Sequence, residues 1–450
     1  MFASIFFVVD IYMLQLYNET FATVNKDVIA AIIATNPSEA QEFISTYLTI
    51  EKLLIVVASI SLLLTLFYYV RRLHFKLNNL SRIILMVMLL ISAIITFKRC
   101  ERIKENNMYY LLYSDCPDLR EYRQHPMVVC NTECIDNIVL ILGESFCKFN
   151  SSLYEYDKET NPFLNNLRNN GNLFVYENVS SACTNTIPAV KSIMMSYIDS
   201  MSDSVEWYRC LTIIETMQQA SYKACWLSNQ SKFGLFDNEV GRFADLCDEQ
   251  FFVGNKNSGM NRDNKDEELL PAINDILSDS VNPCFTIIQL MGSHSAFKNR
   301  YPETFEIFKA SDYDTTHPNL SVENKQLLAE YDNSILYNDY VVYEILQRFA
   351  EKEAVVFYFS DHGIDVFQSS DNYIGHGKHS NTVSERSAKQ IPFMVYTTSL
   401  FREKHPEMQL RIENAVNRSY RTDSIMYTIM DVAGVETVNG VSYKHRSLFK

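Results

Sequence analysis

The sequence predicts an α/β domain with a mostly parallel sheet, preceded by an α-helical transmembrane region. From residue 135 onward, short and nearly unbroken apolar runs alternate with helix-like segments, as expected of a sheet whose strands are buried on both faces. The first 98 residues instead contain three apolar stretches. Because 47% of the 450 residues are hydrophobic, the chain can bury a sizeable core.

The net charge and the cysteine content indicate what kind of partner and what compartment the protein has. A net charge of −14 argues against a nucleic-acid-binding surface. Ten cysteines suit an oxidising compartment. Cys130 and Cys134 are four positions apart, but no second pair at zinc-finger spacing follows them. We therefore expect a disulfide or two unpaired thiols there, rather than half of a zinc site.

The N-terminal region, residues 1–98, is predicted to cross the membrane three times. The expected spans are residues 1–17, 53–70 and 83–97. The second stretch carries no charge and is just long enough to cross the hydrocarbon core of a bilayer. The first lacks the basic start and the small-residue cleavage site of a signal peptide, so we interpret it as a span.

Loop charge predicts the orientation of these spans. Four arginine and lysine residues lie between positions 71 and 82, and the positive-inside rule places such a loop in the cytoplasm. Everything after residue 98 is then extracytoplasmic. It comprises a polar and aromatic connector, residues 99–134, and the predicted α/β domain, residues 135–450.

The strands and helices of this domain follow from its apolar periodicity. Six strands are predicted, at Asn137–Leu142, Leu173–Tyr176, Tyr222–Leu227, Phe285–Met291, Val355–Phe359 and Pro392–Tyr396. Helical spacing of apolar residues predicts a long helix at Glu323–Phe349. It also predicts a last helix at Thr422–Val432, which Gly434 would end.

Two of the predicted strands end in residues that commonly bind metal ions. Glu144 follows the first strand, and Asp361 and His362 follow the fifth. In open α/β sheets, ligands bind just beyond the carboxyl ends of the strands, so functional residues commonly lie there. A capping carboxylate would explain Glu144 alone, and a turn helped by Gly363 would explain the other pair alone. Together they predict one metal site, with ligand types that suit zinc.

A candidate nucleophile lies in residues 180–196, where Thr184 or Thr186 would begin a helix. A hydroxyl at a helix N-terminus gains from the helix dipole and from free N–H groups, which also favour bound phosphate. A zinc ion would lower the pKa of that hydroxyl. The alternative is that the threonine is an ordinary N-cap.

Other polar residues also follow predicted strands. His294 follows Phe285–Met291, Lys232 follows the strand that ends at Leu227, and the segment NYIGHGKHS supplies His376 and His379. A histidine there can bind a metal, donate a proton to a leaving oxygen or satisfy a loop carbonyl. A lysine can neutralise a phosphate.

The set of motifs resembles the membrane phosphoethanolamine transferases of the sulfatase/alkaline-phosphatase superfamily. The motifs are, in order, LILGES, YDKETNPFL, the Thr-rich helix start, MGSH, RYP, YDNSILYNDY, FSDHG and YIGHG. That family includes the lipid A-modifying enzymes behind polymyxin resistance. The resemblance implies a sulfatase-like, alkaline-phosphatase-type catalytic domain over residues 135–450.

The resemblance also implies a zinc-dependent threonine nucleophile. Carried over by motif, Zn²⁺ would be bound by Glu144, Asp361, His362 and the threonine. The role falls on Thr186, with Thr184 as the reserve, because the apolar residues after Thr186 then match the family's helix.

Substrates and location follow from the same resemblance. His294, His376 and Lys232 match positions that handle the phosphoryl group or a second zinc. Phosphatidylethanolamine would be the donor, and the phosphoethanolamine would rest on the threonine before passing to lipid A, the LPS core or another envelope glycan. The protein would be a multi-pass monomer of the inner membrane, with its catalytic domain in the periplasm and no nucleic-acid partner.

Several positions depart from the family pattern. The family has more membrane spans than the three found here, which leaves a truncated or wrongly assigned N-terminus as alternatives. Ile364 stands where an acid often follows DHG, and Lys191 where a proline is common. The alternative functions are a phosphoglycerol transferase of the teichoic-acid or glucan type and a non-catalytic envelope binding protein. Sulfatase activity is not expected, because the sequence lacks the Cys/Ser-x-Pro-x-Arg segment that makes the modified nucleophile of a sulfatase.

Overall fold

The computed structural model divides the chain into two units, Met1–Cys116 and Pro117–Lys450. It describes residues 50–72, 98, 127–130, 134–196, 210–232, 239–253, 264–279, 283–371, 373, 375 and 382–450.

In the first unit, the described residues form one long helix, α4, at Ile50–Arg72. It contains the predicted span 53–70, so the helical character of that stretch is confirmed. Among the helices within the described ranges, none has the combination of length and apolarity that crossing a membrane requires. The predicted spans 1–17 and 83–97 and most of the connector 99–134 lie outside the described residues.

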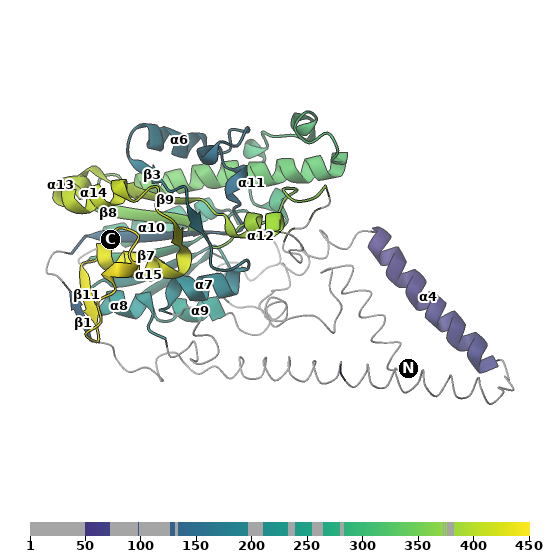
Figure 1. The fold of residues 1–450 in the computed structure, drawn as a ribbon, viewed down its shortest axis with the longest axis horizontal. Helices are drawn as coiled ribbons and strands as arrows, with labels where there is room; N and C mark the ends of the chain where they lie inside the picture. The colour runs from purple at the N-terminus through teal and green to yellow at the C-terminus, as the bar shows by residue number, and fades with distance from the viewer. Residues whose placement is uncertain are drawn as a thin grey trace. The chain divides into compact units, whose positions relative to one another are not determined.

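The second unit is built on a seven-stranded sheet (Figure 1). Across the sheet the order is β3 (Leu173–Val175), β9 (Phe393–Thr397), β8 (Ala354–Ser360), β2 (Asn137–Gly143), β7 (Cys284–Gln289), β5 (Lys223–Ser228) and β6 (Glu249–Phe252). β9 runs antiparallel to both of its neighbours, β3 and β8, and the other pairs of this sheet are parallel. The mostly parallel sheet is therefore confirmed, and each of the six predicted strands is present within two residues of its expected bounds.

The central strand β2 shows why these sequences form buried strands. Every residue of β2 is buried, and alternate side chains enter two separate hydrophobic clusters, since successive residues of a strand point to opposite faces. Ile138, Leu140 and Leu142 enter one cluster, whereas Val139 and Ile141 enter the other. Burying one such side chain is worth about 1.5–3 kcal/mol, which explains why this strand is apolar from Ile138 to Leu142.

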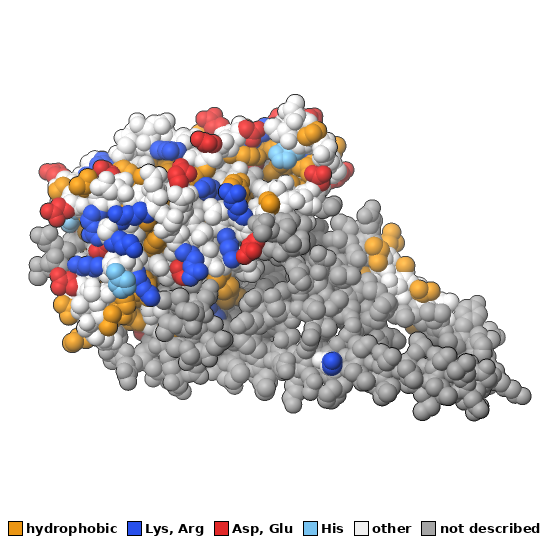
Figure 2. All heavy atoms as spheres, viewed as in Figure 1, with side chains coloured by type: hydrophobic (Ala, Val, Ile, Leu, Met, Phe, Trp, Pro, Cys, Tyr) orange, Lys and Arg blue, Asp and Glu red, His pale blue; other side chains and the backbone are white. Residues whose placement is uncertain are grey.

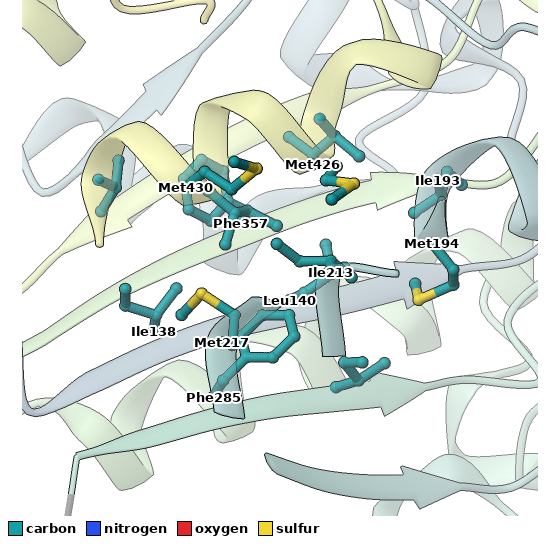
Figure 3. Packing of buried hydrophobic residues seen from close by; sticks show 14 of the residues in the cluster. Ile138, Leu140, Ile193, Met194, Ile213, Met217, Phe285, Phe357, Met426 and Met430 are labelled. Carbon is teal, nitrogen blue, oxygen red and sulfur yellow. The ribbon is translucent and has the colours of Figure 1, made fainter. Parts of the chain in front are cut away.

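Helices cover the first of these faces (Figure 3). Ile138 and Leu140 of β2 pack there with Phe285 of β7 and Phe357 of β8. The helical elements on this side are α7 (Thr186–Met194), α8 (Ile213–Gln219), α9 (Glu239–Ala244), α13 (Ser399–Lys404), α14 (Pro406–Asn414) and α15 (Ile425–Val432). The predicted helix at Thr422–Val432 thus begins with a 3₁₀ turn, Thr422–Ser424, before α15.

The opposite face of the sheet is covered by α6, α10 and α11, at Pro162–Asn169, Leu270–Asp279 and Val322–Phe349. The prediction of α11 is confirmed to within one residue. Its N-cap is Ser321, whose side chain accepts a hydrogen bond from Asn324 N. The remaining helix and strands are α12 (Thr382–Lys389), the antiparallel pair β1 (Val128–Cys130) and β11 (Val435–Val438), and the parallel pair β4 (Val179–Ser180) and β10 (Tyr420–Arg421).

Lysine and arginine side chains gather on one face of this unit, over the C-terminal elements (Figure 2). Two arginines of this part of the chain bind its last residues. Arg411 Nε donates to the carbonyl of Phe449 at 2.7 Å, and Arg418 donates to that of Leu448 at 2.8 Å. These two side chains therefore hold residues 448 and 449 to α14 and to the segment that follows it. Near β1, the thiols of Cys130 and Cys134 are unpaired, which is one of the two outcomes that the sequence allowed.

Candidate active site

The two predicted strand tips meet in the structure. Strands β2 and β8 are parallel neighbours in register, with Gly143 opposite Ser360, so the residues that follow them lie side by side. Glu144, Asp361 and His362 are each at most 1% exposed. One ligand atom from each lies within 4.8 Å of the others. The structure thus brings together the three side chains that the sequence assigned to one metal site.

Thr186 completes this group. It is the first residue of α7, and the N-cap is Asn185 rather than the threonine itself. Its Oγ1 lies 3.2 Å from Glu144 Oε2 and 3.2 Å from His362 Nε2. By contrast, the hydroxyl of Thr184 accepts a hydrogen bond from Asn185 Nδ2 at 3.3 Å. Of the two candidate nucleophiles, Thr186 is therefore the one that contacts the acidic and histidine side chains.

The tautomer of His362 follows from its hydrogen bonds. Its Nδ1 lies 2.8 Å from the carbonyl oxygen of Gly363. Because a carbonyl only accepts, Nδ1 must carry a proton and donate it. In the neutral ring, Nε2 is then left with its lone pair, facing Thr186 Oγ1 and Glu144 Oε1. This is the form in which histidine binds a metal ion.

The charges of these buried side chains act on one another's pKa values. Burial would raise the pKa of Glu144, but the hydrogen bond and positive charge of His362, the charge of His294 and a hydrogen bond from Ser145 lower it below its usual range. Burial and the neighbouring charge of Glu144 raise the pKa of Asp361 instead. Burial would lower the pKa of His362, but the two carboxylates raise it to about 9. Two buried acids this close repel each other when both are ionised, and a bound cation would remove that cost.

One unpartnered atom supports a metal at this position. Asp361 Oδ1 accepts hydrogen bonds from the backbone N–H groups of His362, at 2.7 Å, and Ser145, at 3.3 Å. The other oxygen, Oδ2, is buried without a hydrogen-bond partner among the residues that the structure describes. Buried polar atoms are nearly always satisfied, so an unsatisfied carboxylate oxygen beside His362 Nε2 fits the ligand set of a zinc ion.

Tight backbone packing holds the three candidate metal ligands in place. Ser145 adopts a left-handed φ of 55° and its hydroxyl donates to Glu144 Oε1 at 2.7 Å. Gly292, at φ +51°, packs directly against Glu144, since a Cβ there would lie 2.8 Å from Glu144 N. Gly363 is also needed for close approach, because its Cβ would collide with the carbonyl of Ser387. The Gly residues of GSH and DHG therefore serve the packing of the site.

The structure distributes the other predicted residues differently. His294 is close enough to Glu144 for its charge to lower that pKa, and its buried Nδ1 has no hydrogen-bond partner within the described part of the chain. The ammonium of Lys232 contacts Asp245 Oδ1 at 2.6 Å and Gln250 Oε1 at 2.8 Å. His376 and His379 lie outside the described residues.

Sequence reasoning missed two residues that touch the ligands. The hydroxyl of Ser145 binds Glu144, and so does the side chain of Gln230, whose Nε2 donates to Glu144 Oε2 at 3.1 Å. The positions of both residues in the sequence point to the site. Ser145 directly follows a predicted ligand, and Gln230 lies two positions before Lys232 in the same segment.

The sequence and the fold of this chain are similar to those of known proteins. The family model described as Sulfatase matches residues 136–435. The chain belongs to the sulfatase family. The sulfatase-like fold expected for the domain at residues 135–450 is thereby confirmed.

Within the sulfatase family, the expected resemblance to phosphoethanolamine transferases is also confirmed. The phosphoethanolamine transferase EptC of Escherichia coli strain K12 is 29% identical over 303 residues, which are 66% of this chain and 51% of EptC. The crystal structure of the C-terminal periplasmic domain of E. coli EptC, in complex with Zn, has a TM-score of 0.64 and 26% identity. The match covers 72% of this chain and 90% of that domain.

A third relative shares the fold over most of the chain. It is the integral membrane protein lipooligosaccharide phosphoethanolamine transferase A of Neisseria meningitidis, with a TM-score of 0.72 and 17% identity. That match covers 99% of this chain and 85% of the other. The chain spans about half the length of the curated relatives that it matches.

Proposed function

We propose that this protein is a zinc-dependent phosphoethanolamine transferase with Thr186 as its nucleophile. The observation that carries the proposal is the position of the Thr186 hydroxyl, 3.2 Å from both Glu144 Oε2 and His362 Nε2. Glu144, Asp361 and His362 would hold the Zn²⁺. The bound ion would lower the pKa of the Thr186 hydroxyl, so that it loses its proton near neutral pH.

The start of α7 supplies a place for the phosphoryl group. Thr186 is the first residue of this nine-residue helix, and the first N–H groups of a helix have no acceptor within it. Pro188 has no N–H and Ala189 N donates to the carbonyl of Asn185 at 3.1 Å, so the N–H groups left for a phosphate oxygen at this end of α7 are those of Thr186 and Ile187. The same residue thus provides the attacking oxygen and sits where the transferred group would bind.

Transfer would proceed in two steps. Thr186 Oγ1 forms a bond to the phosphorus of phosphatidylethanolamine, and the bond from phosphorus to the diacylglycerol oxygen breaks. The leaving oxygen takes a proton, for which His294 is the candidate donor. An oxygen of the acceptor then attacks the phosphorus, and the phosphothreonine bond breaks to restore the hydroxyl. We propose lipid A, the LPS core or another envelope glycan as the acceptor.

The location of the protein is part of the proposal. We place residues 1–98 in the inner membrane and the catalytic domain in the periplasm, on the charge pattern of the N-terminal loops. Two relatives support this placement, because one solved EptC fragment is described as a periplasmic domain and the Neisseria relative as an integral membrane protein. His376 and Lys232 remain candidates for phosphoryl-group handling.

A donor assay tests the proposal. Purified protein in detergent would be given zinc and fluorescent phosphatidylethanolamine, and release of fluorescent diacylglycerol would be followed by chromatography. We expect release that stops when a chelator removes the zinc. Thr184→Ala should retain release, and Thr186→Ala should lose it. Release from phosphatidylglycerol but not from phosphatidylethanolamine would instead favour a phosphoglycerol transferase.

A further inference from the structure

The side-chain amide of Gln230, just after β5, is bound to one of the candidate metal ligands. Its Nε2 donates to Glu144 Oε2 at 3.1 Å and to the carbonyl of Leu290 at 2.9 Å. On its other side, Oε1 accepts a hydrogen bond from Gln289 Nε2 at 2.9 Å. Gln230 therefore joins the end of β5 to the carboxylate that follows β2.

The orientation of this amide is determined by its neighbours. Nε2 faces two oxygen acceptors, and Oε1 faces an N–H donor, so a flipped amide would lose all three bonds. Gln289 is held in turn, because the hydroxyl of Ser228 donates to Gln289 Oε1 at 3.1 Å. A directed chain of hydrogen bonds thus runs from Ser228 through Gln289 and Gln230 to Glu144.

The loop that carries Gln230 is itself anchored to the site. Asn229 Nδ2 donates to the buried carboxylate of Asp266 at 2.8 Å. That carboxylate also accepts the backbone N–H groups of Met291, at 2.8 Å, and Gly292, at 2.9 Å. Ser293 N then donates to the carbonyl of Glu144 at 3.0 Å. The loops after β5 and β7 are fastened to each other and to the backbone of Glu144.

We propose that Gln230 is a positioning residue that holds the Glu144 carboxylate in the orientation needed to bind the metal. The proposal rests on the metal site of the proposed function and adds a residue to it. Hydrogen bonds to both oxygens fix the rotation of a carboxylate about its last side-chain bond. Ser145 holds Oε1 and Gln230 holds Oε2. Loss of such an outer partner typically weakens metal affinity by about 10–100-fold.

Zinc affinity of the full chain provides the test. Gln230→Met keeps the length and bulk of the side chain but removes the donor to Glu144. The matched control is Gln218→Met on α8, because Gln218 Nε2 also donates to a backbone carbonyl, that of Leu246 at 3.0 Å. Competition with a chromophoric chelator should show binding at least about 10-fold weaker in Q230M and unchanged in Q218M. The melting temperature of the metal-free protein should fall in both, and further in Q230M, because the Gln230 amide makes three hydrogen bonds and the Gln218 amide makes one.

A second variant covers the case in which Q230M does not fold. Gln289→Met removes the donor that orients the Gln230 amide, so it should weaken zinc binding less than Q230M. In the double variant the two losses should not add. Zinc affinity equal to wild type in Q230M, or in Q289M should Q230M not fold, would overturn the role of Gln230.

This readout separates the inference from the proposed function, since it requires no lipid substrate. Wild-type protein that binds zinc but transfers no phosphoethanolamine would refute the proposed activity without affecting the role proposed for Gln230. Wild-type protein that binds no zinc would overturn both.

Discussion

Replacing Gly292 with alanine should damage the site through a single methyl group. Gly292 has a φ of +51°, and a Cβ built on it would lie 2.8 Å from Glu144 N and 3.0 Å from Glu144 O. Both are backbone atoms of a candidate metal ligand, so neither can move aside as a flexible side chain would. A left-handed conformation costs a non-glycine residue about 1–2 kcal/mol. Overpacking adds about 1–3 kcal/mol.

Another glycine separates these two costs. Gly171 also has a positive φ, +73°, but a Cβ there would meet no atom within 4 Å. Gly171→Ala should therefore lower the free energy of unfolding by the conformational cost alone. Gly292→Ala should lower it by about 1–3 kcal/mol more, which is the overpacking cost.

Denaturant unfolding of the metal-free protein measures both variants, and chelator competition measures their zinc affinity. Because Gly292→Ala must displace the Glu144 backbone, it should also weaken zinc binding, whereas Gly171→Ala should not. If the two variants were equally stable and bound zinc equally well, the close packing of the GSH loop against Glu144 would be wrong.

Three further predictions concern the nucleophile, a ligand and a buried acid. Thr186→Ala should abolish transfer while folding and zinc content stay mostly intact; full activity there with loss in Thr184→Ala would reverse the assignment. Glu144→Ala should weaken zinc binding, and an unchanged metal content would remove it from the site. Burial raises the pKa of Asp332 to about 7, against hydrogen bonds from Tyr313 and other residues. Since this lies above the value of about 4 in an unfolded chain, the folded state binds an extra proton between these two pKa values, and its stability falls as pH rises from about 4 to about 7. Asp332→Asn should reduce that slope by up to about 1.4 kcal/mol per pH unit in denaturant unfolding, and an unchanged slope would refute the assignment.

The sequence predicted the core of the site because parallel strands impose simple geometry. Glu144 and Asp361 each follow an apolar run, and the carboxyl ends of parallel neighbours meet at one edge of a sheet. The alternation of apolar runs and helical segments predicted the sheet for the same reason. β6 escaped prediction because it is a short edge strand with exposed polar residues, so its sequence carries little apolar signal.

What the sequence could not provide is the direction of side chains in loops. In the segment after β5, the sequence favoured Lys232 as a site residue because its ammonium could neutralise a phosphate. In the structure, Gln230 contacts Glu144 instead, and Lys232 contacts Asp245. The choice between Thr184 and Thr186 had the same limit, because the N-cap position, Asn185, decides which hydroxyl faces the ligands. The antiparallel direction of β9 could not be predicted either, because it depends on how the chain connects β8 to β9 and not on the residues of the strand.

Mass spectrometry of the intact protein tests the central claim most directly. The zinc-loaded full chain would be exposed to phosphatidylethanolamine, and peptides covering residues 180–196 would then be mapped. The account predicts a phosphoethanolamine adduct on Thr186 that disappears in Thr186→Ala. An adduct on Thr184, or folded zinc-loaded protein that forms no adduct at all, would contradict it.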